Sequence, residues 1–120
     1  MKQEDKDLLL KDLCARLPYG VKASYYGAEE ECETWDEVEG VESSGYVEIG
    51  QYTLPIKRIK PYLFPLLSMT EEQKNDLTKF VANGVTNENI VYDWLNKNHF
   101  DYRGLIPLGL ANDATGLNIY

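Results

Sequence analysis

The stretch from Thr86 to Ile106 constrains the fold most, because a strongly amphipathic segment is followed directly by the only histidine of the chain. The apolar residues of that segment recur at the spacing that places them on one face of an α-helix. These residues are Ile90, Val91, Trp94 and Leu95. Thr86 or Asn87 can cap the first turn, since a short side-chain oxygen accepts from amides that lack a partner there. The sequence therefore predicts a helix whose apolar face packs against the core.

A polar turn is expected directly after this helix. Gly104 and Pro107 interrupt any helical pattern, so the chain should fold back on itself here. We predict that Asp101 accepts hydrogen bonds from backbone amides of the turn, and that Arg103 bridges this aspartate or a helix C-terminus. His99 is expected to interact with the last carbonyls of the helix. The candidate structural turn comprises His99, Asp101, Tyr102 and Arg103.

The same residues allow an enzymatic alternative. A histidine near an aspartate can act as a general base, because the pKa of histidine lies close to neutrality. However, the motif offers no serine or cysteine as a nucleophile, and the chain contains no phosphate-binding glycine loop, GxSxG or HExxH motif. We therefore expect no catalytic residue and no cofactor, and keep a hydrolase-like enzyme that uses His99 and Asp101 as an alternative.

An amphipathic helix is predicted for residues 3–17. Its apolar stripe is expected to contain Leu9, Leu10, Leu13, Cys14 and Leu17. The residues expected to face away from the core are Lys6, Asp7, Lys11, Asp12 and Arg16. Pro18 and Gly20 should end the helix, because proline disfavours the helical conformation of the residue before it and glycine permits a sharp turn.

Short strands are predicted after this helix. Val21, Ala23 and Tyr25 alternate with more polar residues, which is the period of a half-buried strand. A second strand is expected over residues 31–42, bent at Gly40. Turns at residues 43–45 and 50–51 should lead into strands at 46–49 and 52–54. We expect an antiparallel sheet of three to four strands, with a partly open barrel as one possible form.

The remaining elements complete an α+β fold. Residues 55–69 contain three prolines, which predicts an extended or single-turn connector and excludes a central strand. Thr70 and Gln73 form a capping-box pattern that opens a helix ending at Asn83-Gly84. The last residues, from Pro107, should form an irregular tail. The chain is thus predicted to be a single domain over residues 1–120, with an N-terminal helix, a small antiparallel sheet and two C-terminal helices.

Acidic residues are concentrated in one segment of this chain, whose net charge is −8. Residues 29–48 hold nine acidic residues and no basic one, and such a surface repels a phosphate backbone. Direct nucleic-acid binding is therefore not expected. The segment is interpreted as a solvated strand face, as a docking surface for a basic protein, or as an imitation of nucleic-acid phosphates. The candidate interaction surface comprises Glu29, Glu30, Glu31, Glu33, Trp35, Asp36, Glu37 and Glu39.

A cytoplasmic location without membrane association is expected. No apolar run approaches the length needed to cross a bilayer, and charges interrupt the N-terminal segment where a signal peptide would be apolar. In a reducing compartment Cys14 and Cys32 should be free thiols. Together with His99 they have no recognised metal-binding spacing, so no metal site is expected.

Three motifs resemble a known group of proteins. They are LPYGV at 17–21, KPYLFPLLSMTEEQ at 60–73 and WLNKNHFDYRGLIPLGLA at 94–111. The chain resembles a family of short uncharacterised proteins from gut-bacterial genomes, prophages and phages, and its acidic centre departs most from their pattern. The resemblance implies a mobile-element context and transfers no catalytic residue. Because the chain has no catalytic set, one strongly acidic face and many aromatic residues, we expect a small non-enzymatic accessory protein that binds another protein, with an acidic nucleic-acid-mimicking counter-defence protein as the alternative.

Overall fold

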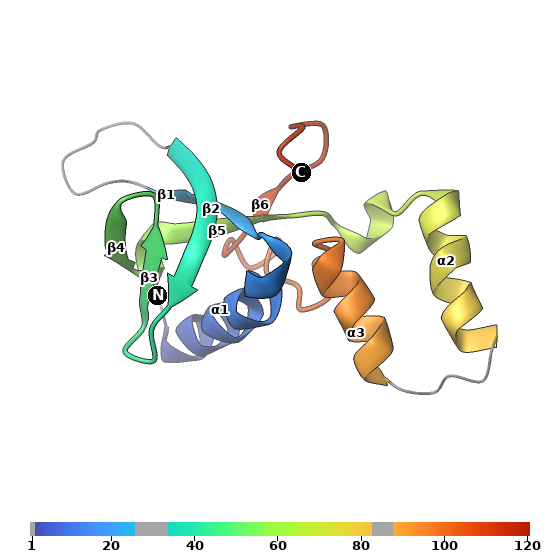
Figure 1. Ribbon diagram of the computed structural model, residues 1–120, viewed down its shortest axis with the longest axis horizontal. Coiled ribbons are helices and arrows are strands. Elements are labelled where there is room, and N and C mark those ends of the chain that lie inside the picture. Colours follow the sequence, from blue (N-terminus) through green and yellow to red (C-terminus); the bar gives the residue numbers. More distant parts are fainter. Residues whose placement is uncertain (1, 26–33, 83–87) are drawn as a thin grey trace.

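A six-stranded sheet forms the body of the protein in the computed structural model, which describes residues 2–25, 34–82 and 88–120 (Figure 1). The strand order is β4-β3-β2-β1-β5-β6, and only the β5–β6 pair is parallel. The strands are β1 (Lys22–Tyr25), β2 (Thr34–Val41), β3 (Tyr46–Ile49), β4 (Tyr52–Pro55), β5 (Ile59–Leu63) and β6 (Asn112–Asp113). The predicted α+β class is confirmed. The expectation of three to four strands was too low, and the sheet is open.

Helix α1 (Gln3–Arg16) packs on one face of this sheet and forms the core with it. Leu9 and Leu13 are fully buried against residues from five strands. These strand residues are Ala23, Val38, Val47, Ile49, Leu54, Ile59 and Leu63, and Val21, directly before β1, is buried with them. The helix was predicted correctly, but two details of its orientation were wrong. Cys14 is exposed, whereas Asp12 and Arg16, which were expected to face solvent, are completely buried.

The turn before β1 and the turns that link β2, β3 and β4 follow the sequence pattern closely. A short 3-10 helix η1 (Leu17–Tyr19) ends at Gly20, whose φ of 69° lies in the left-handed region that glycine adopts without strain. The register between β2 and β3 shifts between Val38 and Gly40, as expected for a bend there. Gly50 makes the tight turn into β4, and a Cβ atom at this position would collide with the hydroxyl of Tyr25.

The segment with three prolines differs from its prediction, because it contributes a strand inside the sheet. It forms the 3-10 helix η2 (Ile56–Arg58), strand β5, and the 3-10 helix η3 (Leu66–Ser68). Pro61 lies in β5 opposite Ala23 of β1. On the other side of β5, β6 pairs only with Tyr62 and Leu63. Within the described sheet, β5 is therefore an edge at Pro61, and edges are where a strand tolerates proline.

The two C-terminal helices lie side by side at the end of the molecule that is far from β4 (Figure 1). Helix α2 (Glu71–Ala82) begins with the predicted capping box, since Thr70 N donates to Gln73 Oε1 at 2.9 Å and Gln73 N donates to Thr70 Oγ1 at 3.2 Å. Helix α3 (Glu88–Lys97) buries Leu95 but leaves Ile90 exposed. The predicted caps at Thr86 or Asn87 and the stop at Asn83-Gly84 lie outside the described residues.

The tail after α3 is irregular, as predicted, except for β6. Its backbone joins the sheet where Ala114 N donates to Leu63 O at 2.8 Å. Leu110 and Ile119 are buried, so this segment forms part of the fold. In the described part of the chain, no helix combines the length and apolar composition needed to span a membrane.

Candidate functional site

A buried network of charges connects α1 to the turn that follows α3. Arg16 donates from Nε to Asp12 Oδ2 at 2.9 Å, and Arg103 donates from one terminal nitrogen to Asp12 Oδ1 at 2.7 Å. The terminal nitrogens of Arg16 also donate to the carbonyl oxygens of Leu95 and Phe100. The carboxylate of Asp12 thus accepts hydrogen bonds from two guanidinium groups, and Arg16 also donates to carbonyl oxygens near the end of α3. Sequence reasoning missed this network because its members lie far apart in the chain.

The candidate structural turn is held by Asp101, as predicted. Its two carboxylate oxygens accept from the backbone amides of Leu105 and Ile106 at 2.8 and 2.9 Å. The predicted role of Arg103 was wrong, since its ion pair is with Asp12 and its guanidinium lies over the Tyr102 ring, 4.5 Å from the centroid. The Tyr102 hydroxyl donates to Asn96 at 3.0 Å. The turn is therefore tied to both α1 and α3.

His99 lies at the end of α3 with a left-handed backbone, φ 60°. Its amide donates to Asn96 O at 3.1 Å, and its carbonyl accepts from Phe64 N at 2.8 Å. The imidazole is buried, stacks on the Tyr120 ring at a centroid distance of 3.8 Å, and hydrogen-bonds the backbone of Tyr19. Burial, followed by the positive charge of Arg16, lowers the pKa of His99 to about 4. The ring is therefore neutral at pH 7.

Tyr120 covers this histidine and holds the tail against β1. Its hydroxyl accepts from Lys22 N at 2.8 Å and donates to Tyr62 O at 2.8 Å. Burial of this hydroxyl raises the pKa of Tyr120 above its usual range. His99 Nδ1 is the one buried side-chain nitrogen or oxygen without a hydrogen-bond partner among the described residues. No hydrogen bond joins His99 to Asp101 there, and the absence of catalysis stays a prediction.

Part of the predicted acidic surface lies on β2. Trp35, Asp36, Glu37 and Glu39 are exposed, whereas Glu29, Glu30, Glu31 and Glu33 lie outside the described residues. Trp35 and Glu37 pair with Ser24 and Lys22, which alternate with the β1 side chains buried under α1. They therefore project from the opposite face of the sheet. Asp36 pairs with buried Ala23 and so points to the other face, away from this group.

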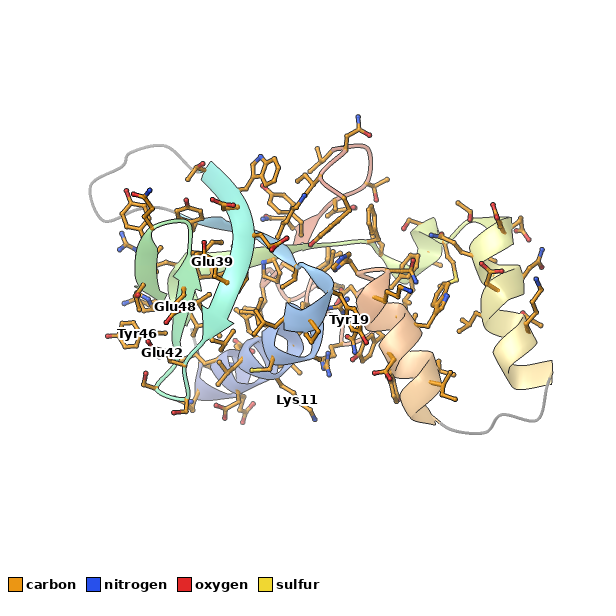
Figure 2. The ribbon with its side chains drawn as sticks, viewed as in Figure 1. Lys11, Tyr19, Glu39, Glu42, Tyr46 and Glu48 are labelled. Atoms are coloured by element: carbon orange, nitrogen blue, oxygen red, sulfur yellow. The ribbon has the colours of Figure 1, made fainter. Side chains whose placement is uncertain are left out.

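Strand β3 adds two exposed residues to this face, Tyr46 and Glu48. Glu48 pairs with Gly40 of β2, and its carboxylate lies directly over that glycine. In Figure 2, Glu39, Tyr46 and Glu48 lie along β2 and β3, at the opposite end of the molecule from α2 and α3. We call this group the acidic sheet face, and it consists of Trp35, Glu37, Glu39, Tyr46 and Glu48. The alternation of residues 46–49 in the sequence could have identified the two β3 members.

The acidic sheet face is not neutralised by neighbouring bases. None of its three glutamates forms an ion pair with a described residue. Lys22 lies opposite Glu37 in the register, but its ammonium donates to Ile119 O at 2.7 Å and lies 5.4 Å from the centre of the Trp35 ring. The tail covers the adjoining β1 and β5, where Asn112 donates to Ser24 at 2.8 Å. Among the described residues, the tail thus contacts the β1 and β5 part of this face, beside the acidic part.

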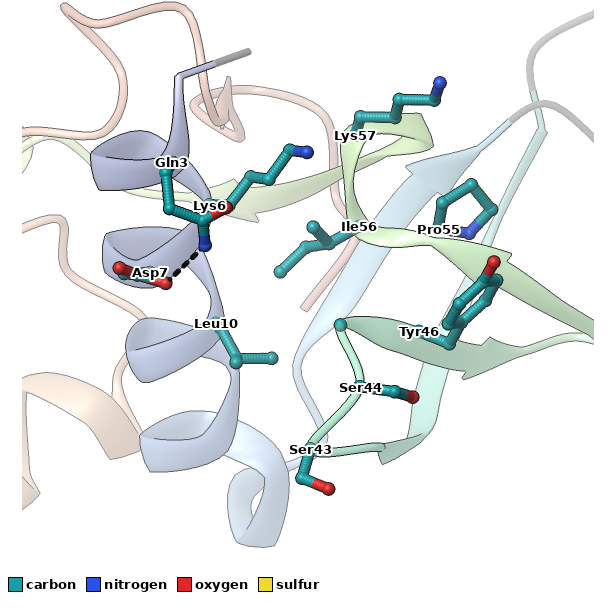
Figure 3. Close-up of a pocket in the computed structure, with 11 residues that line it drawn as sticks. Gln3, Lys6, Asp7, Leu10, Ser43, Ser44, Tyr46, Pro55, Ile56 and Lys57 are labelled. Carbon is teal, nitrogen blue, oxygen red and sulfur yellow. Dashed lines mark hydrogen bonds between the residues drawn. The ribbon is translucent and has the colours of Figure 1, made fainter.

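The described surface includes cavities in the two places given below. One, of about 330 Å³, lies between α1, the β2–β3 turn and η2 (Figure 3). The other, of about 210 Å³, lies beside Phe64 and Phe100, near the start of α2. Neither His99 nor Asp101 lines either cavity. Within residues 2–25, 34–82 and 88–120, no group of three or more histidine, cysteine or acidic side chains is placed to hold a metal ion.

Comparison of the chain with models of known protein families, with curated proteins and with solved structures finds no match. The resemblance to short phage and prophage proteins therefore stays a prediction. The geometry alone distinguishes two kinds of polar cluster. Asp12 and Asp101 form hydrogen bonds within the protein, whereas the three glutamates of the acidic sheet face form no ion pair with a described residue.

Proposed function

We propose that this protein is a non-enzymatic accessory protein that binds a basic protein partner through its acidic sheet face. One observation carries the proposal: Glu37, Glu39 and Glu48 are exposed together and form no ion pair with a described residue. Like charges held close together repel one another, and a partner with complementary charge removes this cost while steering the encounter. The proposed mobile-element setting rests on the sequence resemblance alone.

The aromatic residues on this face support a protein partner. Trp35 and Tyr46 are 48% and 45% exposed, which is unusual for such large apolar rings. Aromatic side chains supply much of the binding energy at protein interfaces, and their ring faces also attract lysine and arginine. Lys22 already lies over the Trp35 ring. A partner that presents basic side chains would use both the carboxylates and the rings.

Capture from bacterial lysate at physiological salt, with two matched variants, tests this proposal. The triple variant Glu37→Gln, Glu39→Gln, Glu48→Gln removes three charges from the acidic sheet face. The control Glu4→Gln, Glu71→Gln, Glu72→Gln removes three charges from exposed positions on α1 and α2. We expect the wild type and the control to retain the same basic protein and the first triple variant to lose it. Equal retention by both variants, or no retained protein, would contradict the proposal.

Added DNA identifies the kind of partner. If the acidic sheet face imitates nucleic-acid phosphates, duplex DNA will displace the captured protein, and binding will weaken steeply with added salt. If DNA does not displace the partner, the partner binds the acidic sheet face as an ordinary protein surface and not as an imitation of nucleic acid. Both results are consistent with the proposed binding, but only displacement supports a counter-defence role.

A further inference from the structure

The larger of these two cavities has a mixed lining, in which apolar side chains come from three parts of the fold. Leu10 of α1 and Ile56 of η2 point toward each other across it, and Tyr46 and Pro55 continue the wall on the sheet side (Figure 3). Ile56 is only 3% exposed, so its position is fixed by the core. A volume of about 330 Å³ lies within the range of pockets that bind small molecules. The cavity thus offers apolar contact to a compact ligand.

Two lysines add positive charge to this cavity. Lys6 extends from α1 across the cavity toward η2, and Lys57 lies at the opposite rim with its ammonium pointing outward (Figure 3). Neither forms an ion pair with a described residue. The acidic residue in the lining, Asp7, accepts from Gln3 Nε2 at 2.9 Å and points away from Ile56. The lining therefore carries excess positive charge in a chain whose net charge is −8.

From this juxtaposition we infer that the cavity binds a small organic anion, with its apolar body against Leu10 and Ile56 and its carboxylate or phosphate group facing Lys6, while Lys57 at the rim adds positive charge. An ammonium group is a compact point charge that accepts either anion. The site lies apart from the acidic sheet face except at Tyr46, which belongs to both.

Titration of ¹⁵N-labelled protein with three probes, followed by amide chemical shifts, tests the inference. Phenylacetate should cause saturable shifts at residues 3–10, 43–46 and 55–57. Phenylacetamide, which has the same shape without the charge, should bind at least about fivefold more weakly. Phenyl phosphate should shift the same amides, and the relative affinities of the two anions show whether the cavity prefers a phosphate ester or a carboxylate. Absence of saturable shifts at these residues, or equal binding of phenylacetamide, would overturn the inference.

Two matched variants assign the charge recognition to the lysines. Lys6→Gln with Lys57→Gln should weaken phenylacetate binding by at least about fivefold. Lys11→Gln with Lys97→Gln removes the same charge from exposed positions outside the cavity and should leave binding unchanged. All four positions are on the surface or partly exposed, so the amide spectra should show that both variants fold. Unchanged binding in the first variant would remove the basis of the inference.

Discussion

Asp12 of α1 and Arg103 in the turn after α3 form an ion pair of 2.7 Å, although they lie 91 positions apart in the sequence. The same carboxylate binds Arg16, and both side chains of that pair are fully buried. Charges taken out of water are stable only while they remain paired and hydrogen-bonded. The network therefore holds the C-terminal turn against the N-terminal helix.

Replacement of Asp12 by asparagine should destabilise the protein severely. It removes the negative charge that both guanidinium groups use and leaves the buried Arg16 without its counter-ion. We expect the free energy of unfolding, measured with urea, to fall by about 3 to 5 kcal/mol. Asp7→Asn, at an exposed position on the same helix, should change it by less than about 0.5 kcal/mol. Similar values for the two variants would show that the network contributes nothing specific.

Asp101→Asn tests the turn itself. The carboxylate accepts two backbone amides with two oxygens, whereas an asparagine side chain has one oxygen to offer. One buried amide would lose its partner, which costs about 1 to 3 kcal/mol in the free energy of unfolding. Hydrogen exchange should show faster exchange at Leu105 or Ile106. A variant with wild-type stability and protection would contradict the assigned role of this carboxylate. Asp93→Asn, at an exposed position on α3, is the matched control.

Stability should decrease as the pH falls from about 6.5 to about 4, because of His99. In the unfolded chain this histidine binds a proton below its ordinary pKa of 6.5, whereas in the folded protein its pKa is lowered to about 4. Between these pH values the unfolded state therefore binds more protons than the folded state. This difference lowers the free energy of unfolding by up to about 3 kcal/mol. His99→Asn keeps a residue type that tolerates positive φ. The free energy of unfolding of this variant, measured with urea, should lose that part of its pH dependence. If it changed with pH as steeply as in the wild type, His99 would not be the cause.

The capping box predicts a local effect in α2. Thr70→Ala removes the oxygen that accepts from Gln73 N, so the first turn of the helix should be less stable by about 1 kcal/mol. Amide exchange at the start of α2 measures this directly. Thr78→Ala, within the same helix, removes a hydroxyl that bonds only to the carbonyl one turn earlier, and it should leave the exchange of the first turn unchanged.

Features that depend on neighbouring residues could be predicted from the sequence. Thr70 caps Gln73 three positions later, and Asp101 accepts amides four and five positions later, so residue type and spacing sufficed. The hairpin turns and the bend at Gly40 were equally local. The exposure of the acidic residues on β2 followed from their charge.

Features that depend on distant partners could not be predicted. Hydropathy places Asp12 and Arg16 in water, and only the fold reveals that Arg103 and carbonyls near the end of α3 meet them. A proline such as Pro61 disfavours a strand. In the described sheet, however, β6 pairs only with Tyr62 and Leu63, so β5 has an unpaired edge at Pro61. Likewise, the pairing of β2 with β3 joins Glu48 to the acidic sheet face. In each case the topology of the fold, and not the spacing in the sequence, determines which residues become neighbours.

The most direct test of the central claim is the footprint of the captured basic partner on this protein. Hydrogen exchange of the complex at physiological salt should show protection concentrated in β2 and β3, around Glu37, Glu39 and Glu48, with α2 and α3 unaffected. The same experiment with the Glu37→Gln, Glu39→Gln, Glu48→Gln variant should show no protection. Protection confined to α2 and α3, or protection that survives the triple substitution, would contradict recognition through the acidic sheet face.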